Sequence, residues 1–216
     1  MKKNVLQLTA LSSLLFSAAT LASDISAEIK VVGEISTSTC EVTMQNNGVF
    51  DFGEIRQSQV SDSKVTDLKT VSNGGVHVKC SAPTALSFIT SDNRSGTASY
   101  GGLGRSLGLG NVNGTGKMGF YQLHINDATV DGETSRLFTS LDNATVGTTA
   151  YTVPIQLGQR TGWAPASGAQ EMSIGKDFAF NITANVFLAS KSDMKGPLPE
   201  DASLDGSATM EFGFGL

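Results

Sequence analysis

The chain ends in the stretch SATMEFGFGL, residues 207–216, in which apolar residues alternate with small or polar ones. The apolar positions are Ala208, Met210, Phe212, Phe214 and Leu216. In an extended chain, residues two apart share one face, so this stretch predicts a β-strand with one buried side. Large apolar residues at a chain end need a cover, because chain ends usually fray and are polar. Two interpretations stay open: the strand closes the core of a β-sandwich, or it binds a partner.

Short alternating runs of the same kind occur along most of the chain, and no long segment has apolar residues at helical spacing. Only 16% of the residues are charged, and 24 are glycine. Composition and pattern together predict an all-β sandwich. Further strands are expected over residues 25–35, 40–44, 49–53, 76–80, 86–89, 119–125, 151–157 and 178–188. Residues 46–48 predict a turn, and residues 91–117 a long loop with a short pairing near 107–109.

The first 22 residues have the pattern of a signal peptide. Lys2 and Lys3 are followed by an apolar run over residues 5–21, and the small residue Ala22 ends a plausible cleavage site. Polar residues interrupt the run, which is too short for a permanent membrane span. We therefore expect export, and cleavage after Ala22 would leave 194 of the 216 residues, enough for one domain.

The charge balance argues against a nucleic-acid partner. The full chain has a net charge of −5. Removing Lys2 and Lys3 from the 15 basic residues would leave 13 against 20 acidic residues, a net charge of −7. Such a surface repels phosphates, so no nucleic acid is expected as a partner.

Cys40 and Cys80 are the two cysteines of the chain. In an exported protein, a single pair is expected to form a disulfide in the oxidising periplasm. The alternative, a reactive or metal-binding thiol pair, lacks both a CxxC motif and a histidine at ligand spacing. We predict a structural disulfide between them.

The sequence predicts no enzyme activity, no metal and no cofactor. His77 and His124 both lie in expected strands, without a nucleophile or carboxylate motif nearby. The glycine-rich residues 102–110 superficially resemble a phosphate-binding loop, but no buried parallel strand precedes them and no amphipathic helix follows. Asp51, Asp92 and Asp127 are the acids expected at strand ends, where carboxylates usually form turns.

Trp163 is the single tryptophan and follows Gly162 in what looks like an exposed loop. An exposed ring of this kind is a candidate for stacking on a carbohydrate. Packing against the edge of the sandwich is the favoured interpretation, because large aromatic rings bury much apolar surface.

Several fragments in order resemble a known family. They are the signal peptide, Gly33 to Ile35 before Cys40, VFDFGEI at residues 49–55, VHVKC at residues 76–80, VPI at residues 153–155, and the alternating C-terminus. Together they resemble a subunit of a chaperone-usher fimbria of the type 1-like pilin family. The resemblance implies an immunoglobulin-like sandwich that lacks its last strand. A periplasmic chaperone fills the gap during export, and the N-terminal extension of the next subunit later replaces it.

For this chain, the resemblance implies a structural subunit that polymerises by donor-strand exchange and contributes to cell adhesion. Its expected partners are the periplasmic pilus chaperone, the outer-membrane usher and neighbouring subunits, on an export route through the periplasm to the cell surface. Residues 23–32 would be the extension and residues 33–216 the sandwich domain. The implied donor strand presents Ile25, Ala27, Ile29 and Val31, and the C-terminal strand meets the chaperone through Ala208, Met210, Phe212, Phe214 and Leu216.

Two features depart from the family pattern: the family usually has a tyrosine next to last and a longer donor segment, whereas this chain ends in Phe214, Gly215 and Leu216. The alternative function is a self-contained secreted or periplasmic sandwich that binds carbohydrate, for instance a host glycan. In that case residues 91–117 and Trp163 would form the binding surface.

Overall fold

The computed structural model describes residues 29–33 and 37–216, and the chain divides into two compact units, Met1–Ile35 and Ser36–Leu216. The predicted signal peptide and the positions Ile25 and Ala27 lie outside the described residues. Residues 29–33 belong to no strand, contrary to the strand expected over residues 25–35. Ile29 and Val31 are 88% and 94% exposed.

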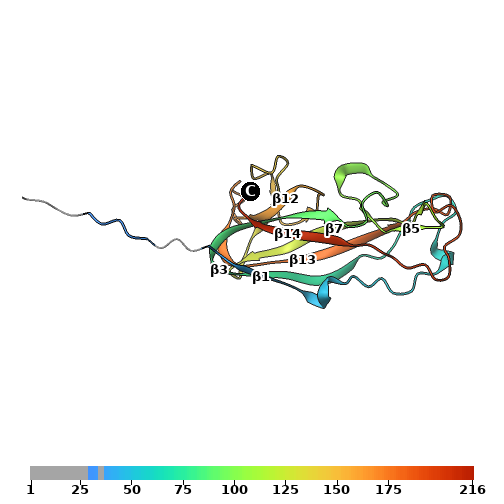
Figure 1. The fold of residues 1–216 in the computed structure, drawn as a ribbon, viewed down its shortest axis with the longest axis horizontal. Helices are drawn as coiled ribbons and strands as arrows, with labels where there is room; N and C mark the ends of the chain where they lie inside the picture. Colours follow the sequence, from blue (N-terminus) through green and yellow to red (C-terminus); the bar gives the residue numbers. More distant parts are fainter. Residues whose placement is uncertain (1–28, 34–36) are drawn as a thin grey trace, which may run out of the picture. The chain divides into compact units, whose positions relative to one another are not determined.

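The Ser36–Leu216 unit is the predicted all-β sandwich, in two antiparallel layers that share one long strand, β3 (Figure 1). The first layer is built mainly from long strands, in which inward-facing apolar residues alternate with outward-facing residues. The members of this layer, in spatial order, are β1 (Cys40–Met44), the first half of β3 (Val71–Asp92), β13 (Ile174–Leu188), β7 (Gly119–Val130) and β11 (Val153–Pro154). Shorter additions to it are β2 (Thr66–Asp67), β4 (Leu107–Gly108) and β8 (Glu133–Thr134).

The second layer uses the other half of β3. Its order is β14 (Ala208–Phe214), β3, β12 (Arg160–Ala164), β9 (Arg136–Thr139) and β10 (Thr149–Ala150). The remaining described elements are β5 (Asn111–Val112), β6 (Gly116–Lys117) and three short 3-10 helices, η1 (Gln45–Gly48), η2 (Gln57–Gln59) and η3 (Gly102–Gly104). Within the described part of the chain, no helix is long and apolar enough to cross a membrane.

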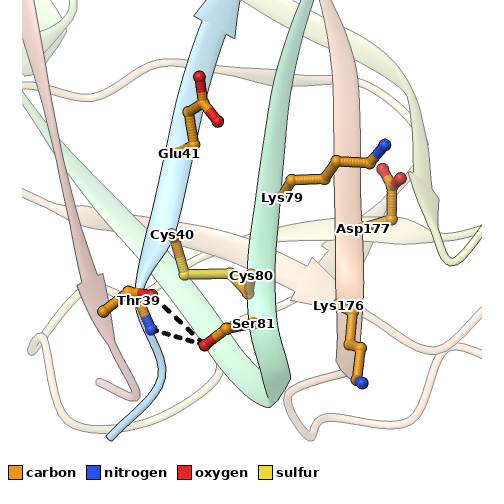
Figure 2. Close-up of a pocket in the computed structure, with 8 residues that line it drawn as sticks. All are labelled: Thr39, Cys40, Glu41, Lys79, Cys80, Ser81, Lys176 and Asp177. Atoms are coloured by element: carbon orange, nitrogen blue, oxygen red, sulfur yellow. Dashed lines mark hydrogen bonds between the residues drawn. A yellow bond between two sulfur atoms is a disulfide. The ribbon is translucent and has the colours of Figure 1, made fainter.

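β3 joins the layers because it turns sharply midway along its length. Cys80 still pairs with β1, whereas Leu86 already pairs with β14. Figure 2 shows the turn just beyond Ser81. Pro83 lies in this turn. Proline has no backbone N–H, and at this position none is needed for pairing with a neighbouring strand. The sequence predicted two strands here, and the structure has one bent strand.

Aromatic residues from both layers fill one end of the core. Trp163 is completely buried, with its ring centroid 5.0 Å from that of Phe178 and 5.4 Å from that of Phe180. Its Nε1 donates a hydrogen bond to the carbonyl of Ala179 at 3.1 Å. The prediction of an exposed loop around Trp163 is therefore wrong, because this residue lies in β12. The favoured interpretation, that the ring packs against the sandwich, is correct.

Several expected elements have the predicted positions. β1 covers the predicted residues 40–44, β7 and β13 contain the stretches predicted for them, and β14 lies within the predicted residues 207–216 but ends at Phe214. The turn at residues 46–48 has left-handed backbone angles at Asn46, Asn47 and Gly48. Residues 49–53, by contrast, form no strand, and the strand expected over residues 151–157 is reduced to Val153–Pro154.

Cys40 and Cys80 are bonded to each other, as predicted, and are directly paired across β1 and β3. The bond closes a loop of 40 residues. We expect Cys40→Ser or Cys80→Ser to lower the free energy of unfolding by about 4 kcal/mol, because a loop of this size strongly restricts the unfolded chain. Urea unfolding of oxidised protein and variant measures this difference. Equal stability of variant and parent would show that the bond contributes nothing to the fold.

Candidate functional site

β1 and β14 are edge strands of the two layers. Within residues 29–33 and 37–216, β3 is the one strand that pairs with β1, and the one strand that pairs with β14. Each of them therefore has a second edge without a strand neighbour. Open edges of this kind readily accept another strand.

The inward face of β1 is exposed, although its neighbours on the same face are buried. Val42 and Met44 pair with Val78 and Val76 of β3, so their side chains point to the same side. Val78 and Val76 are 0% and 1% exposed, whereas Val42 and Met44 are 43% and 39% exposed. The inward-facing side chains of β3 are therefore covered by the core, whereas those of β1 remain accessible to solvent.

β14 has the same asymmetry on the opposite layer. Ala208, Met210 and Phe212 point inward and are half-buried, while Thr209 and Glu211 are exposed. The ring of Phe212 lies 5.3 Å from the ring of Phe88, between ring centroids. This inward face therefore reaches the core without being fully covered by it.

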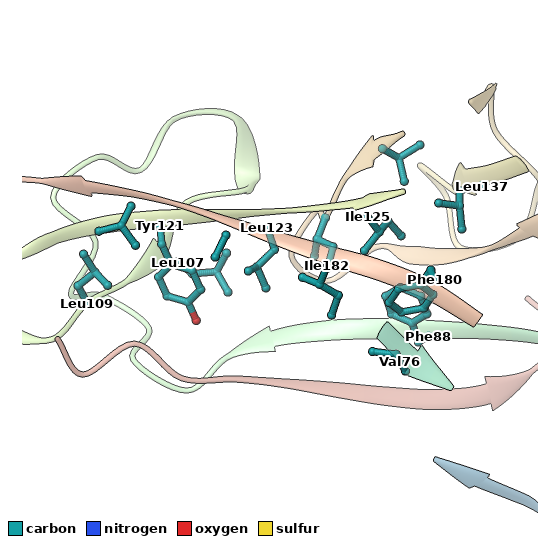
Figure 3. Close-up of a cluster of buried hydrophobic side chains, with 14 of the residues drawn as sticks. Val76, Phe88, Leu107, Leu109, Tyr121, Leu123, Ile125, Leu137, Phe180 and Ile182 are labelled. Atoms are coloured by element: carbon teal, nitrogen blue, oxygen red, sulfur yellow. The ribbon is translucent and has the colours of Figure 1, made fainter. Parts of the chain in front are cut away.

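The two open faces line one groove, with a volume of about 530 Å³. Its floor consists of side chains from β7 and β13: Leu123, Ile182, Ala184 and Val186. Figure 3 shows Tyr121, Leu123 and Ile182 projecting from these strands. The walls are Val42, Met44, Val49, Phe50 and Phe52 on the β1 side, and Ala208, Met210 and Phe212 on the β14 side. Leu109, Tyr121, Leu204 and Gly206 line it near the start of β14, and Asn47, Gly48 and Ser207 complete the lining.

The free edge of β14 presents main-chain hydrogen-bonding groups to a neighbour. Asn93 N–H donates to the carbonyl of Ser207 at 3.0 Å, and Gly215 N–H donates to the carbonyl of Ala85 at 2.9 Å. Odd-numbered residues of this segment therefore bond to β3, and the alternation of an antiparallel ladder turns the N–H and C=O groups of Ala208, Met210 and Phe212 the other way. A strand laid along β14 would satisfy these groups.

The groove contains no charged lining residue among those that the structure describes. Its main polar side chain near the start of β14 is Tyr121, where burial raises the pKa of the phenol, so the hydroxyl stays neutral. Nearby, Arg94 donates from Nε and Nη2 to the Asp205 carboxylate, at 2.7 Å for each bond. These bonds lower the pKa of Asp205 and attach the segment before β14 to the end of β3. The surface is suited to an uncharged, apolar occupant.

The residues predicted for the C-terminal strand divide into two groups. Ala208, Met210 and Phe212 line the groove, whereas Phe214 and Leu216 are not among its lining residues. Phe214 is 55% exposed, so the single apolar face expected through Leu216 ends at Phe212. The residues predicted for the donor strand lie in the other unit or outside the described residues.

The other candidate residues have structural surroundings. His77 is exposed, with Nε2 3.1 Å from Asp177 Oδ1, and His124 is half-buried, where burial lowers its pKa. The carboxylate of Asp92 accepts main-chain hydrogen bonds from Arg94 and Gly108, as a turn-forming acid does. No group of acidic, histidine or cysteine side chains in the described residues could hold a metal ion.

A second, shallower pocket surrounds the disulfide (Figure 2). Glu41, Lys79, Lys176 and Asp177 contribute charges of both signs to it. Thr39 N–H donates to Ser81 Oγ at 3.1 Å beside the bond. Its mixed charges favour neither an anionic nor a cationic ligand.

The sequence pattern missed the β1 wall of the groove. Val42 and Met44 alternate with Cys40, and this period of two was a signal that they face inward with the cysteine. Phe50 and Phe52 also alternate, but they lie in an unpaired segment instead of the strand expected there.

The N-terminal part of the chain matches a known family model. Residues 29–107 match the model of a family described as a protein of unknown function, DUF1120. The matched part contains β1, β3 and both cysteines, so this chain is similar to that family over one edge of the groove. No curated protein matches the chain.

Proposed function

We propose that this protein is a structural subunit of a chaperone-usher fimbria that polymerises by donor-strand exchange and contributes to cell adhesion. The observation that carries the proposal is the shared groove of β1 and β14. Val42 and Met44 on one edge, and Met210 and Phe212 on the other, are inward-facing apolar residues that remain partly exposed. An inserted strand would cover them and pair with the free edge of β14.

The proposed partners follow from this groove and from the family resemblance. A periplasmic pilus chaperone would occupy the groove during export, the outer-membrane usher would receive the complex, and a neighbouring subunit would then replace the chaperone. The acidic net charge and the apolar groove are compatible with a protein partner. The implied route runs through the periplasm to the cell surface.

Production of the full chain in the periplasm, with and without a pilus chaperone, tests the proposal. We expect a chaperone-bound species on a native gel, and a ladder of polymers or aggregates without the chaperone, because an uncovered groove and edge associate with other chains. A stable monomer that does not bind the chaperone would overturn the proposal. Glycan binding by such a monomer would favour the carbohydrate-binding alternative, for which the buried Trp163 gives no support.

A further inference from the structure

We propose that residues 25–31 of a second copy lie antiparallel to β14 with Ser26 opposite Glu211, and that Glu211 sets this register. The inference rests on the proposed function, since it specifies the occupant of the same groove. Its starting point is length. The apolar positions Ile25 to Val31 span seven residues, as do the groove-lining positions from Gly206 to Phe212.

The direction follows from the sheet that the new strand would extend. All twelve strand pairings described are antiparallel, and β14 itself pairs antiparallel with β3. An antiparallel neighbour uses the outward-pointing groups of Ala208, Met210 and Phe212 in straight hydrogen bonds. The segment would therefore run from Phe212 toward Gly206.

The sizes of facing side chains favour one register. With Ile25 opposite Phe212, Ala27 faces Met210, Ile29 faces Ala208 and Val31 faces Gly206. Three of these four pairs place a larger residue against a smaller one, which is the arrangement that fills a core without voids. Any other register that keeps the apolar face inward differs by an even number of residues.

Charge excludes the two nearest alternatives. Glu211 is exposed, and it is the one charged residue of β14. A shift of two residues in one direction places Asp24 opposite Glu211, and in the other direction Glu28. Like charges directly opposite each other destabilise a strand pair. The proposed register instead places the neutral Ser26 there.

A shift of four residues places Lys30 opposite Glu211, which charge alone would favour. In that register, however, Gly33 faces Ala208 and Val31 faces Met210. Small then faces small and large faces large, which leaves a void at one position and crowding at the other. Among these four registers, packing and charge agree only for the one with Ser26.

Disulfide trapping tests the register. Position 209 is a non-hydrogen-bonded site on the free edge, where facing side chains are close enough for a disulfide. Full-length T209C, which keeps Glu211, is combined in one chain with S26C, E28C, K30C or V32C, and polymers are separated without reductant. We expect the E28C combination, which reports Ser26 opposite Glu211, to give at least fivefold more cross-linked dimer and higher species than the other three.

A second trap tests the role of Glu211 itself. In the proposed register Thr209 faces Glu28, so T209C should cross-link mainly to E28C. Adding E211K makes Asp24 or Glu28 attractive opposite position 211, and T209C should then cross-link to S26C or K30C. An unchanged T209C pattern would overturn the role of Glu211 in setting the register.

The remaining outcomes separate the register from the function. Dominant trapping of T209C through S26C, K30C or V32C in the presence of Glu211, or no trapping in a protein that still forms a native ladder, would overturn the register and leave the proposed function standing. Cross-linking confined to monomers would show that the chain fills its own groove and would overturn the second copy as occupant. Loss of both ladder and cross-links would count against both proposals.

Discussion

Fusion of residues 23–32 after Leu216, through a short glycine and serine linker, should raise the melting temperature by about 12 to 24 °C. Burying Ile25, Ile29 and Val31 contributes about 2 kcal/mol for each side chain. Each kcal/mol raises the melting temperature of a domain of this size by about 2 to 4 °C. A short linker suffices, because an antiparallel strand would begin beside Phe212, four residues before the chain end. Thermal unfolding followed by circular dichroism measures the shift.

The matched control carries I25D and I29D in the added segment only. A carboxylate in the apolar groove would lose its hydration without gaining a partner, so this fusion should melt like the unfused chain. A sandwich without a vacancy would show no rise with either segment. An unchanged melting temperature for the parent fusion would therefore contradict the donor-strand mechanism.

Patterns of period two predicted several strands well. β13 and β14 alternate over many residues, and β1 was predicted with the bounds that it has. Such alternation reflects a strand with one covered face, which is a local property of the sequence. These strands supply much of the groove, so part of the candidate site was also predictable.

Local pattern failed for β9 and β12, neither of which was expected. β12 is short, and Thr161 to Ala164 are buried without alternation. Gly162 looks like a loop residue, yet a side chain there would place its Cβ 3.0 Å from the carbonyl oxygen of Leu86. The glycine therefore serves the close approach of β12 to β3, which sequence alone does not reveal.

The partial exposure of the groove walls could also not be predicted from a local pattern. Alternation shows that Val42 or Met210 faces inward, but their cover depends on which strand lies beside them in the folded chain. That depends on pairings such as β1 with β3 and β14 with β3, which join residues far apart in sequence. The family resemblance suggested an incomplete sandwich, and the partly exposed inward faces of β1 and β14 are compatible with that suggestion.

Asp substitutions on β14 should separate the groove face from the exposed end of the strand. We expect Phe212→Asp to lower assembly, measured as ladder or chaperone complex on native gels, by about 100-fold or more, since a buried charge costs several kcal/mol. Phe214→Asp should lower it by less than about threefold, because Phe214 is already 55% exposed and does not line the groove. A uniform role for the strand's apolar residues would instead make the two variants equally defective.

Phe212 also packs on Phe88, so its substitution can weaken the fold itself. Val42→Asp on the opposite wall avoids this difficulty, because Val42 is 43% exposed and its carboxylate would stay in contact with water in the unoccupied groove. We expect the free energy of unfolding of the isolated Val42→Asp chain, measured with urea, to stay within about 1 kcal/mol of the parent value. The same variant should nevertheless fail to assemble. Thr43→Asp is the matched control, since Thr43 is exposed on the other face of β1 and should assemble normally. Normal assembly of Val42→Asp would show that no apolar segment is inserted beside β1, and would contradict the proposed role of the β1 wall in assembly.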